Sequence, residues 1–386
     1  MYNFDFKKLR AVYIHWPFCP YRCHFCDFIA LAGHERFMER YSNSLNLEIN
    51  KMFDCLSTVQ KTEIDSLYIG GGTPSTWPNS LLLDMSVTLN NKLTFSKHAE
   101  ITIEVNPGAV SEGQFEFLKN IGINRVSIGV QSLDNAVLSG LNRKHTAQDT
   151  LKTLNQASLF FENINVDLIL GLPGVSEEEW KKIIKTVVFW PIKHISVYFL
   201  TVYEKTPLYF GLKTNKFTLP DGDSLVPLYE WTVQELSCYG FNRYEISNFA
   251  KEGFESRHNK TYWNRDPYIG IGLGACSFDG KCRLQNKKNL IDYMECLEKG
   301  GSQIGFMEQL TEDQIQMERL MLGLRTKDGI EARFIWQNKN AIEVDEKKSL
   351  VKELERIGLL EKFDGKIRLT SAGMAVENDI ILKLIS

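Results

Sequence analysis

The sequence has no apolar run of the roughly 18 residues that a membrane-spanning helix needs. Its first ten residues, MYNFDFKKLR, contain no signal-peptide apolar region. We therefore expect no transmembrane segment and a cytoplasmic location. An excess of one charge is also missing, because 45 basic residues nearly balance 48 acidic ones. The resulting net charge of -3 provides no basic footprint for a polyanion, so we expect no nucleic acid as partner.

Cysteines are too few for a disulfide scaffold, with 8 in 386 residues. Three of them, Cys19, Cys23 and Cys26, nevertheless lie close together in the run HWPFCPYRCHFCDF. A cubane iron-sulfur cluster normally takes four thiolates, so this spacing predicts a 4Fe-4S cluster whose fourth iron is bound by another molecule. The spacing alone leaves zinc as an alternative, with His15 or His24 as fourth ligand, and also leaves ordinary free thiols.

Short β-rich segments alternate with helical patterns over the first half of the chain. We expect strands at 11–17, 66–71, 101–107, 125–132, 164–174 and 194–200. We expect helices at 35–53, 81–93, 114–122, 149–160, 178–190 and 223–240. Two of these helices begin with capping-box spacing, at Ser111 with Gln114 and at Ser176 with Glu179. This α/β alternation predicts a parallel sheet, which is either doubly wound or a partial barrel.

Polar and glycine-rich positions follow the ends of the predicted strands. In both architectures, ligands bind beyond the carboxyl ends of the strands, so these positions share one rim. Alternation places Glu104 and Asn106 on the same side of the third strand. The other positions of this kind are Gly71, Gly72, Thr73, Gln131, Arg143, His145 and Asp167. Any one of them alone is more often structural, but together they predict a single ligand site.

The alternation stops near residue 240. Residues 1–240 are predicted to form the core, 241–300 a loop-rich segment, and 301–386 a third region. This third region has helical patterns at 312–324 and 349–360, followed by Asp364-Gly365 as a type I′ hairpin turn. The order predicts a small winged-helix-like domain, and its mixed charges favour a packing module over DNA binding.

The cysteine loop and the run Gly70-Gly71-Gly72-Thr73-Pro74 together resemble the radical S-adenosylmethionine (SAM) family. The resemblance implies a six-unit partial (β/α) barrel, a 4Fe-4S cluster on the three cysteines and SAM on the open iron. It implies SAM contacts for Tyr13, Phe25, Gly71, Gly72, Thr73, Glu104, Gln131, Arg143 and Asp167, which match the coproporphyrinogen-oxidase-like branch. One departure is Asn142, where that branch usually has glycine; asparagine tolerates left-handed backbone, so the turn is expected to survive.

Two features separate the members of this branch. The oxygen-independent coproporphyrinogen III oxidases have a fourth cysteine two positions after the third, and this chain has Phe28 there. The run HNKTYW at 258–263 matches the HNxxYW motif of the heme chaperones, whose histidine is implicated in heme binding. Tyr262 and Trp263 are suited to flanking a porphyrin. Without this match, His258 beside two aromatic residues reads as ordinary packing.

The resemblance thus favours a heme chaperone that binds heme through His258 and delivers it to an acceptor protein. We predict no catalytic residue, and we count an electron donor and a homodimer among the expected partners. Two enzymes stay as alternatives, the coproporphyrinogen III oxidase of porphyrin biosynthesis and a related radical SAM methyltransferase. If the chain is an enzyme, it is expected to catalyse oxidative decarboxylation of the porphyrinogen.

Overall fold

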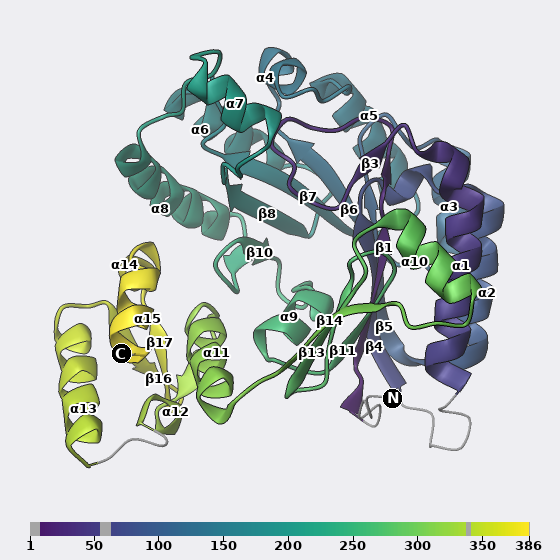
Figure 1. Ribbon diagram of the computed structural model, residues 1–386. Coiled ribbons are helices and arrows are strands. Elements are labelled where there is room, and N and C mark those ends of the chain that lie inside the picture. The colour runs from purple at the N-terminus through teal and green to yellow at the C-terminus, as the bar shows by residue number, and fades with distance from the viewer. Residues whose placement is uncertain (1–7, 55–62, 337–340, 386) are drawn as a thin grey trace.

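The computed structural model describes residues 8–54, 63–336 and 341–385. A twelve-stranded sheet curves through most of the molecule, with the strand order β14-β13-β12-β11-β1-β4-β5-β6-β7-β8-β10-β9 (Figure 1). Its central strands are β1 (Ala11–Trp16), β4 (Glu63–Gly71), β5 (Thr94–Val105), β6 (Arg125–Gln131), β7 (Asn163–Leu170) and β8 (His194–Phe199). Each pairs in parallel with the next, which confirms the predicted six-unit partial barrel.

Helices cover the outer face of this curved sheet (Figure 1). They are α1 (Met38–Phe53), α2 (Asn79–Lys92), α3 (Glu112–Asn120), α5 (Ala147–Ser158), α6 (Glu177–Val187) and α8 (Gly222–Cys238). Two short helices, α4 (Asn135–Gly140) and α7 (Pro207–Lys213), lie beyond the strand ends and pack with the cysteine loop. On β1, Val12, Ile14 and Trp16 belong to the apolar core, whereas Tyr13 and His15 alternate with them and point inward. The barrel therefore has an apolar outer layer and a polar interior.

The two predicted capping boxes have different outcomes. Ser176 and Glu179 satisfy each other's backbone amides, as the spacing predicts. Ser111 accepts from the Gln114 amide, but the Gln114 side chain donates to the Ser75 carbonyl at 2.8 Å instead of returning to Ser111. A tertiary hydrogen bond has replaced half of the local motif.

Residues 241–300 extend both edges of the same sheet, where the sequence pattern predicts loops. At one edge, β10 (Asn248–Ala250) is antiparallel to β8 and pairs with β9 (Asn242–Arg243). At the other edge, β11 (Tyr268–Ile271) is parallel to β1. The helices of this segment are α9 (Arg257–Trp263) and α10 (Leu290–Glu298). The second edge continues through β12 (Cys276–Phe278), β13 (Cys282–Asn286) and β14 (Ile304–Gln309).

The sheet thus runs past residue 300, where the third region was expected to begin. These strands are short, so their alternation has too few positions to stand out in the sequence. A small pair of strands, β2 (Phe18–Cys19) and β3 (Leu31–Ala32), brackets the cysteine loop.

The C-terminal region has a hydrophobic core of its own, which runs from Leu320 to Leu384. Its elements are α11 (Glu312–Leu324), β15 (Ile330–Glu331), α12 (Arg333–Trp336), α13 (Ala341–Arg356), β16 (Leu360–Phe363), β17 (Lys366–Leu369), α14 (Ser371–Ala375) and α15 (Glu377–Ile385). Asp364 and Gly365 have φ values of 48° and 74°, as a type I′ turn requires. This arrangement of helices and a hairpin confirms the winged-helix-like prediction.

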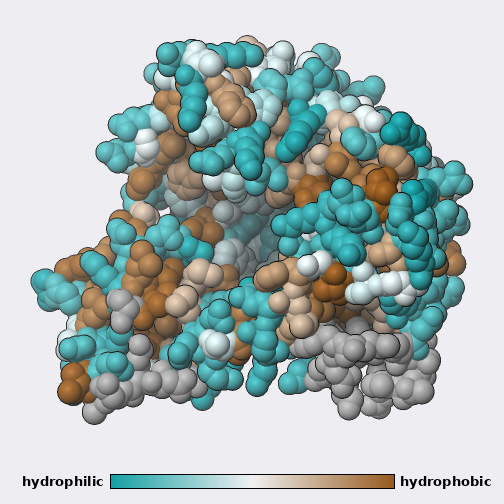
Figure 2. All heavy atoms as spheres, in the orientation of Figure 1, coloured by the Kyte–Doolittle hydropathy of each residue, from teal (hydrophilic) through white to brown (hydrophobic). Residues whose placement is uncertain are grey.

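Hydrophilic residues predominate on the face of the molecule in Figure 2, with apolar residues scattered between them. The surface on this side is hollowed between the barrel and the C-terminal region (Figure 2). In the parts of the chain that the structure describes, no helix combines the length and the apolar character that crossing a membrane requires.

A buried carboxyl joins the added strands to the barrel. Glu48 of α1 accepts from the Gly272 amide at 2.9 Å and from Asn286 Nδ2 at 2.7 Å, and it also accepts from the Tyr293 hydroxyl. Burial raises the pKa of Glu48 from 4.5 to about 7. The folded protein thus favours the protonated form of Glu48. The stability that this carboxyl contributes is fully present below about pH 4.5 and is lost as the pH rises through 7.

Replacing Glu48 by glutamine is expected to remove this pH dependence, because the amide stays neutral at every pH. The thermal midpoint of Glu48→Gln relative to the parent chain should rise as the pH increases from about 5 to about 8. Glu39→Gln, an exposed change on the same helix, is the control and should track the parent chain. Parallel curves for Glu48→Gln and the parent chain would show that this carboxyl does not titrate on unfolding.

Candidate functional site

A cavity of about 410 Å³ opens at the carboxyl ends of β4 to β8. All the predicted site residues except Tyr13, His145 and His258 line it. These are Cys19, Cys23, Phe25, Cys26, Gly71, Gly72, Thr73, Glu104, Asn106, Gln131, Arg143 and Asp167. Parallel strands place their ends on one rim, so residues far apart in the sequence meet here.

Cys19 ends β2, and Cys23 and Cys26 lie on the loop that follows. Thr73 Oγ1 donates to Cys19 Sγ at 3.4 Å, and Arg143 Nη1 donates to Cys23 Sγ at 3.4 Å. Burial raises the pKa of Cys19 to about 11 and also raises that of Cys26. The thiols of Cys19 and Cys26 are therefore protonated without a metal, and metal binding must release their protons.

The zinc alternative does not fit this arrangement, although one of its two candidate histidines, His24, has a ring nitrogen without a hydrogen bond in the described chain. His15 is hydrogen-bonded through both ring nitrogens, to the Tyr13 hydroxyl and to the Ile29 carbonyl, each at 2.9 Å. Among the described residues, no three Cys, His, Asp or Glu side chains gather closely enough to hold a single ion. Three thiols spread along one wall of a cavity fit a cluster, in which each thiolate binds a different iron.

Two buried carboxyls face the same cavity. Glu104 accepts from the Tyr68 hydroxyl at 2.8 Å and from the Gly71 amide at 3.0 Å, and burial raises its pKa to about 7. Asp167 accepts from Ser127 Oγ at 3.0 Å and from Asn165 at 2.8 Å, and burial raises its pKa as well. A ligand that carries an ammonium group and hydroxyls would offset this desolvation, as SAM does.

Arg143 provides the positive side of the cavity. Its Nη2 donates to the Gly129 carbonyl at 2.6 Å and to Asn106 Oδ1 at 3.1 Å. Its Nε is buried and has no hydrogen-bond partner. A buried donor without a partner is costly, so this atom suits an acidic ligand group such as the SAM carboxylate.

The chain has Asn142 where the related branch usually has glycine, and the backbone at this position accommodates it. Its φ is 59°, in the left-handed region that asparagine accepts better than most residues. Its Nδ2 donates to the Arg22 carbonyl at 2.8 Å, which is a bond that glycine cannot make. The departure therefore adds a hydrogen bond between this turn and the cysteine loop.

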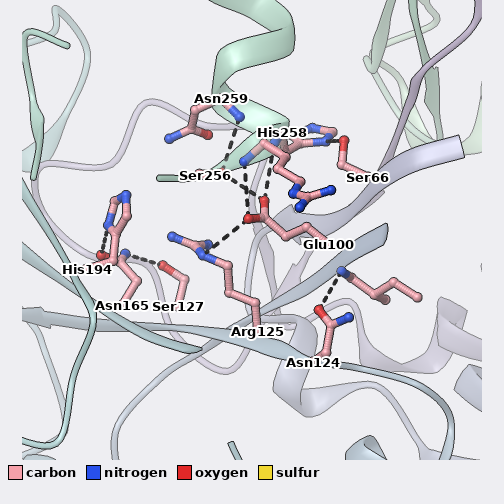
Figure 3. Close-up of polar contacts among 12 residues, drawn as sticks. Ser66, Glu100, Asn124, Arg125, Ser127, Asn165, His194, Ser256, His258 and Asn259 are labelled. Atoms are coloured by element: carbon pink, nitrogen blue, oxygen red, sulfur yellow. Dashed lines mark hydrogen bonds and ion pairs between the residues drawn. The ribbon is translucent and has the colours of Figure 1, made fainter. Parts of the chain in front are cut away.

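His258 and Tyr13 lie deeper in the barrel than the cavity. His258 is 1% exposed; its Nδ1 is 3.0 Å from Ser66 Oγ and its Nε2 is 2.8 Å from the Tyr262 hydroxyl. In Figure 3 it lies above Glu100, which accepts from the His258 amide at 3.2 Å. Tyr13 stacks on Tyr68 with ring centroids 6.3 Å apart. The structure thus separates these two residues from the other predicted ones.

Several cavity residues were not predicted. Tyr68, Ser127 and Tyr198 point inward from β4, β6 and β8 and line the cavity. Tyr68 and Ser127 belong to strands whose C-terminal ends were assigned to the rim, whereas no site residue was assigned to the strand that carries Tyr198. Alternation is the signal for Tyr68 and Ser127, because Tyr68 shares a strand face with Gly70 and Ser127 shares one with Gly129.

Comparisons with known proteins agree with this geometry. The model of the radical SAM superfamily matches residues 13–187, and that of the HemN C-terminal domain matches 310–376. The heme chaperone HemW of Bacillus subtilis is 32% identical over 96% of this chain and 98% of its own length. HemW of Lactococcus lactis is 31% identical over 98% of each chain. A mouse mitochondrial protein, radical S-adenosyl methionine domain-containing protein 1, is 31% identical over 97% of this chain and 87% of its own.

A solved structure shows the same fold. Coproporphyrinogen III oxidase (HemN) from Escherichia coli superposes with a TM-score of 0.83 at 23% identity, over 98% of this chain and 91% of that one. The barrel, the cysteine-lined cavity and the superfamily match define a radical SAM protein. Within that superfamily, the chain belongs to the HemW family. The superfamily implies a 4Fe-4S cluster and SAM, and the thiols, carboxyls and Arg143 described above fit both.

Replacing Cys23 by alanine is expected to abolish cluster loading, because two thiolates would remain for a cluster that takes three from this chain. Iron and sulfide content after anaerobic reconstitution, together with the visible absorbance of the cluster, measures the loss. Cys238→Ala removes an exposed thiol far along the chain and should leave both values unchanged. A full complement of iron and sulfide in Cys23→Ala would contradict this assignment.

Proposed function

We propose that this chain is a heme chaperone that carries a 4Fe-4S cluster and SAM and passes heme to an acceptor protein. The support is its near-full-length similarity to proteins named heme chaperone HemW. The residue that carries the distinction from the oxidases is Phe28, which is 72% exposed and lines the cavity where they have a cysteine. We assign this activity to the cytoplasm, where the three thiols stay reduced.

The residues of the cavity have distinct roles in this proposal. Cys19, Cys23 and Cys26 hold the cluster, Glu104 and Asp167 accept hydrogen bonds from SAM, and Arg143 faces its carboxylate. The cluster and SAM together supply one-electron chemistry when both are bound. Phe25 and Tyr68 contribute ring surface to the cavity lining, which excludes water from the bound nucleotide.

The predicted heme ligand His258 needs a conformational change for this role. Its ring must lose the bonds to Ser66 and Tyr262, each of which contributes about 1 kcal/mol, and α9 must move to expose it. Burial lowers its pKa to about 3, so the imidazole is neutral, as a metal ligand must be. Ligation by His258 therefore stays a prediction that requires α9 to open.

The oxidase is the second candidate. The shared fold and the HemN C-terminal domain favour it, but neither contains information on substrate choice. A radical SAM methyltransferase is a third reading, which has only the superfamily match in its favour. An electron donor, an acceptor protein and a homodimer complete the set of proposed partners.

Paired assays on the reconstituted full chain distinguish the chaperone from the oxidase. We expect stoichiometric hemin binding, followed as a change in the Soret band, and no conversion of coproporphyrinogen III under reducing anaerobic conditions with SAM present. Catalytic formation of protoporphyrinogen would establish the oxidase instead. A coproporphyrinogen III oxidase of known activity serves as the positive control for the turnover assay.

Glu104→Gln tests the proposed SAM site. Removing the charge weakens hydrogen bonds to a cationic ligand, so we expect SAM affinity to fall by about tenfold or more. Equilibrium dialysis of labelled SAM against the reconstituted protein measures this. The exposed change Glu116→Gln on α3 is the control. Unchanged affinity in Glu104→Gln would remove this carboxyl from the binding site.

A further inference from the structure

We propose that Tyr68 and Tyr244 connect the SAM cavity to α9, so that occupancy of the cavity controls whether this helix opens to expose His258. The inference rests on the proposed function and names a regulation of its heme site. It starts from the finding that α9 must move before His258 can reach a heme iron. Each of the two cavity carboxyls, Glu104 and Asp167, is linked to α9 through side chains of the barrel interior.

The first connection runs from Glu104 through Tyr68 to His258. The Tyr68 hydroxyl donates to Glu104 Oε1 at 2.8 Å. The ring of Tyr68 stacks on the imidazole of His258, with centroids 5.1 Å apart and an angle of 28° between the planes. One phenol side chain therefore contacts both a cavity carboxyl and the histidine of the HNKTYW segment.

The packing around Tyr68 ties its position to that of Glu104. A Cβ atom on Gly70 would lie 2.8 Å from Tyr68 Cε1 and 3.0 Å from the carboxyl carbon of Glu104, so both side chains press against the same stretch of backbone. Departure of His258 removes the ring surface on which Tyr68 rests. Tightly packed groups of this kind have discrete arrangements, so a shift at one end is felt at the other.

The second connection runs from Asp167 to the start of α9. Asn165 Nδ2 donates to Asp167 Oδ1 at 2.8 Å, and Asn165 Oδ1 accepts from His194 Nδ1 at 2.6 Å (Figure 3). The Tyr244 hydroxyl donates to His194 Nε2 at 2.9 Å and accepts from the Ser256 amide at 3.3 Å. Ser256 is the N-cap residue of α9, so this connection ends at the first turn of the helix.

The hydrogen bonds of the second connection all have a fixed direction. The amide oxygen of Asn165 can only accept, so His194 carries its proton on Nδ1 and accepts on Nε2. His194 is fully buried, and removal of any one bond leaves a buried group without a partner. A buried network in which each donor has one acceptor is stabilised as a unit.

SAM in the cavity favours the closed position of α9. A cationic ligand beside Glu104 and Asp167 holds both carboxyls in the charged form. Tyr68 and Asn165 then donate to charged acceptors, and such bonds are roughly twice as strong as neutral ones. Opening of α9 disturbs both connections, so SAM binds the closed form more tightly than the open form and shifts the equilibrium toward it.

The consequence for heme is a negative coupling between two separate sites. Heme takes the open form, whereas SAM takes the closed form. Each ligand therefore weakens the binding of the other by the same factor, as thermodynamic linkage requires. On this view the chain without SAM takes up heme, and SAM binding favours heme release to the acceptor.

Amide hydrogen exchange on the full, reconstituted chain tests the closure of α9 without any heme. In the parent chain, saturating SAM should slow exchange across residues 257–263 at least fivefold. Tyr68→Phe and Tyr244→Phe each remove one hydroxyl of a connection and should reduce this factor, and the double variant should lose it. Equilibrium dialysis confirms saturation with SAM, and iron and sulfide content confirms the cluster, for every variant.

Tyr262→Phe is the matched control. This hydroxyl also bonds to His258, at 2.8 Å, but it belongs to α9 itself and to neither connection. Exchange across α9 should become faster overall in Tyr262→Phe, while SAM still slows it by the parental factor. The two single variants, which each keep one connection, decide the question should the double variant not fold.

Hemin titration with and without saturating SAM completes the test. SAM should weaken hemin binding at least fivefold in the parent chain and leave it unchanged in the double variant. Exchange across α9 that does not respond to SAM in the parent chain overturns the inference and leaves the chaperone function standing. Equal protection by SAM in the parent chain and in both single variants overturns the roles of Tyr68 and Tyr244. A parent chain that binds no hemin rejects the proposed function, while the exchange measurement still decides whether SAM closes α9.

Discussion

The polar interior of the barrel depends on one buried ion pair. Arg125 is 2% exposed and lies 3.9 Å from Glu100, which is 6% exposed. Glu100 also accepts from Ser256 Oγ at 2.9 Å and from the amides of Arg257 and His258 (Figure 3). A buried charge is tolerated only when it is paired and hydrogen-bonded, so the first turn of α9 must lie against the barrel. This contact holds α9, which contains the HNKTYW segment, against Glu100 of β5.

A second polar layer lies nearer the cavity and is not neutralised in the same way. Glu104 and Asp167 have raised pKa values and hydrogen-bond only to neutral donors, while Arg143 leaves one buried nitrogen without a partner. The layer around Glu100 therefore contains an ion pair with Arg125, whereas Glu104 and Asp167 make no ion pair in the described chain and suit a charged ligand. This difference separates the structural part of the barrel from the part that binds the cofactor.

His258 belongs to the same layer as Glu100. Its sequence motif therefore implies one role, and its buried position in the structure indicates another. The motif HNKTYW implies heme binding through the family, but its histidine stacks on Tyr68 at 5.1 Å and is buried.

The sequence by itself determined the six central strand-helix units, the three thiols and the polar strand-end residues that line the cavity. These follow from local periodicity and from the rule that parallel strands end on one rim, so no long-range contact had to be known. Only the tertiary structure decided that residues 241–300 extend the sheet and that His258 is buried. Those features depend on pairing and packing between distant segments, such as β11 beside β1 and α9 on Glu100, which one-dimensional patterns do not record.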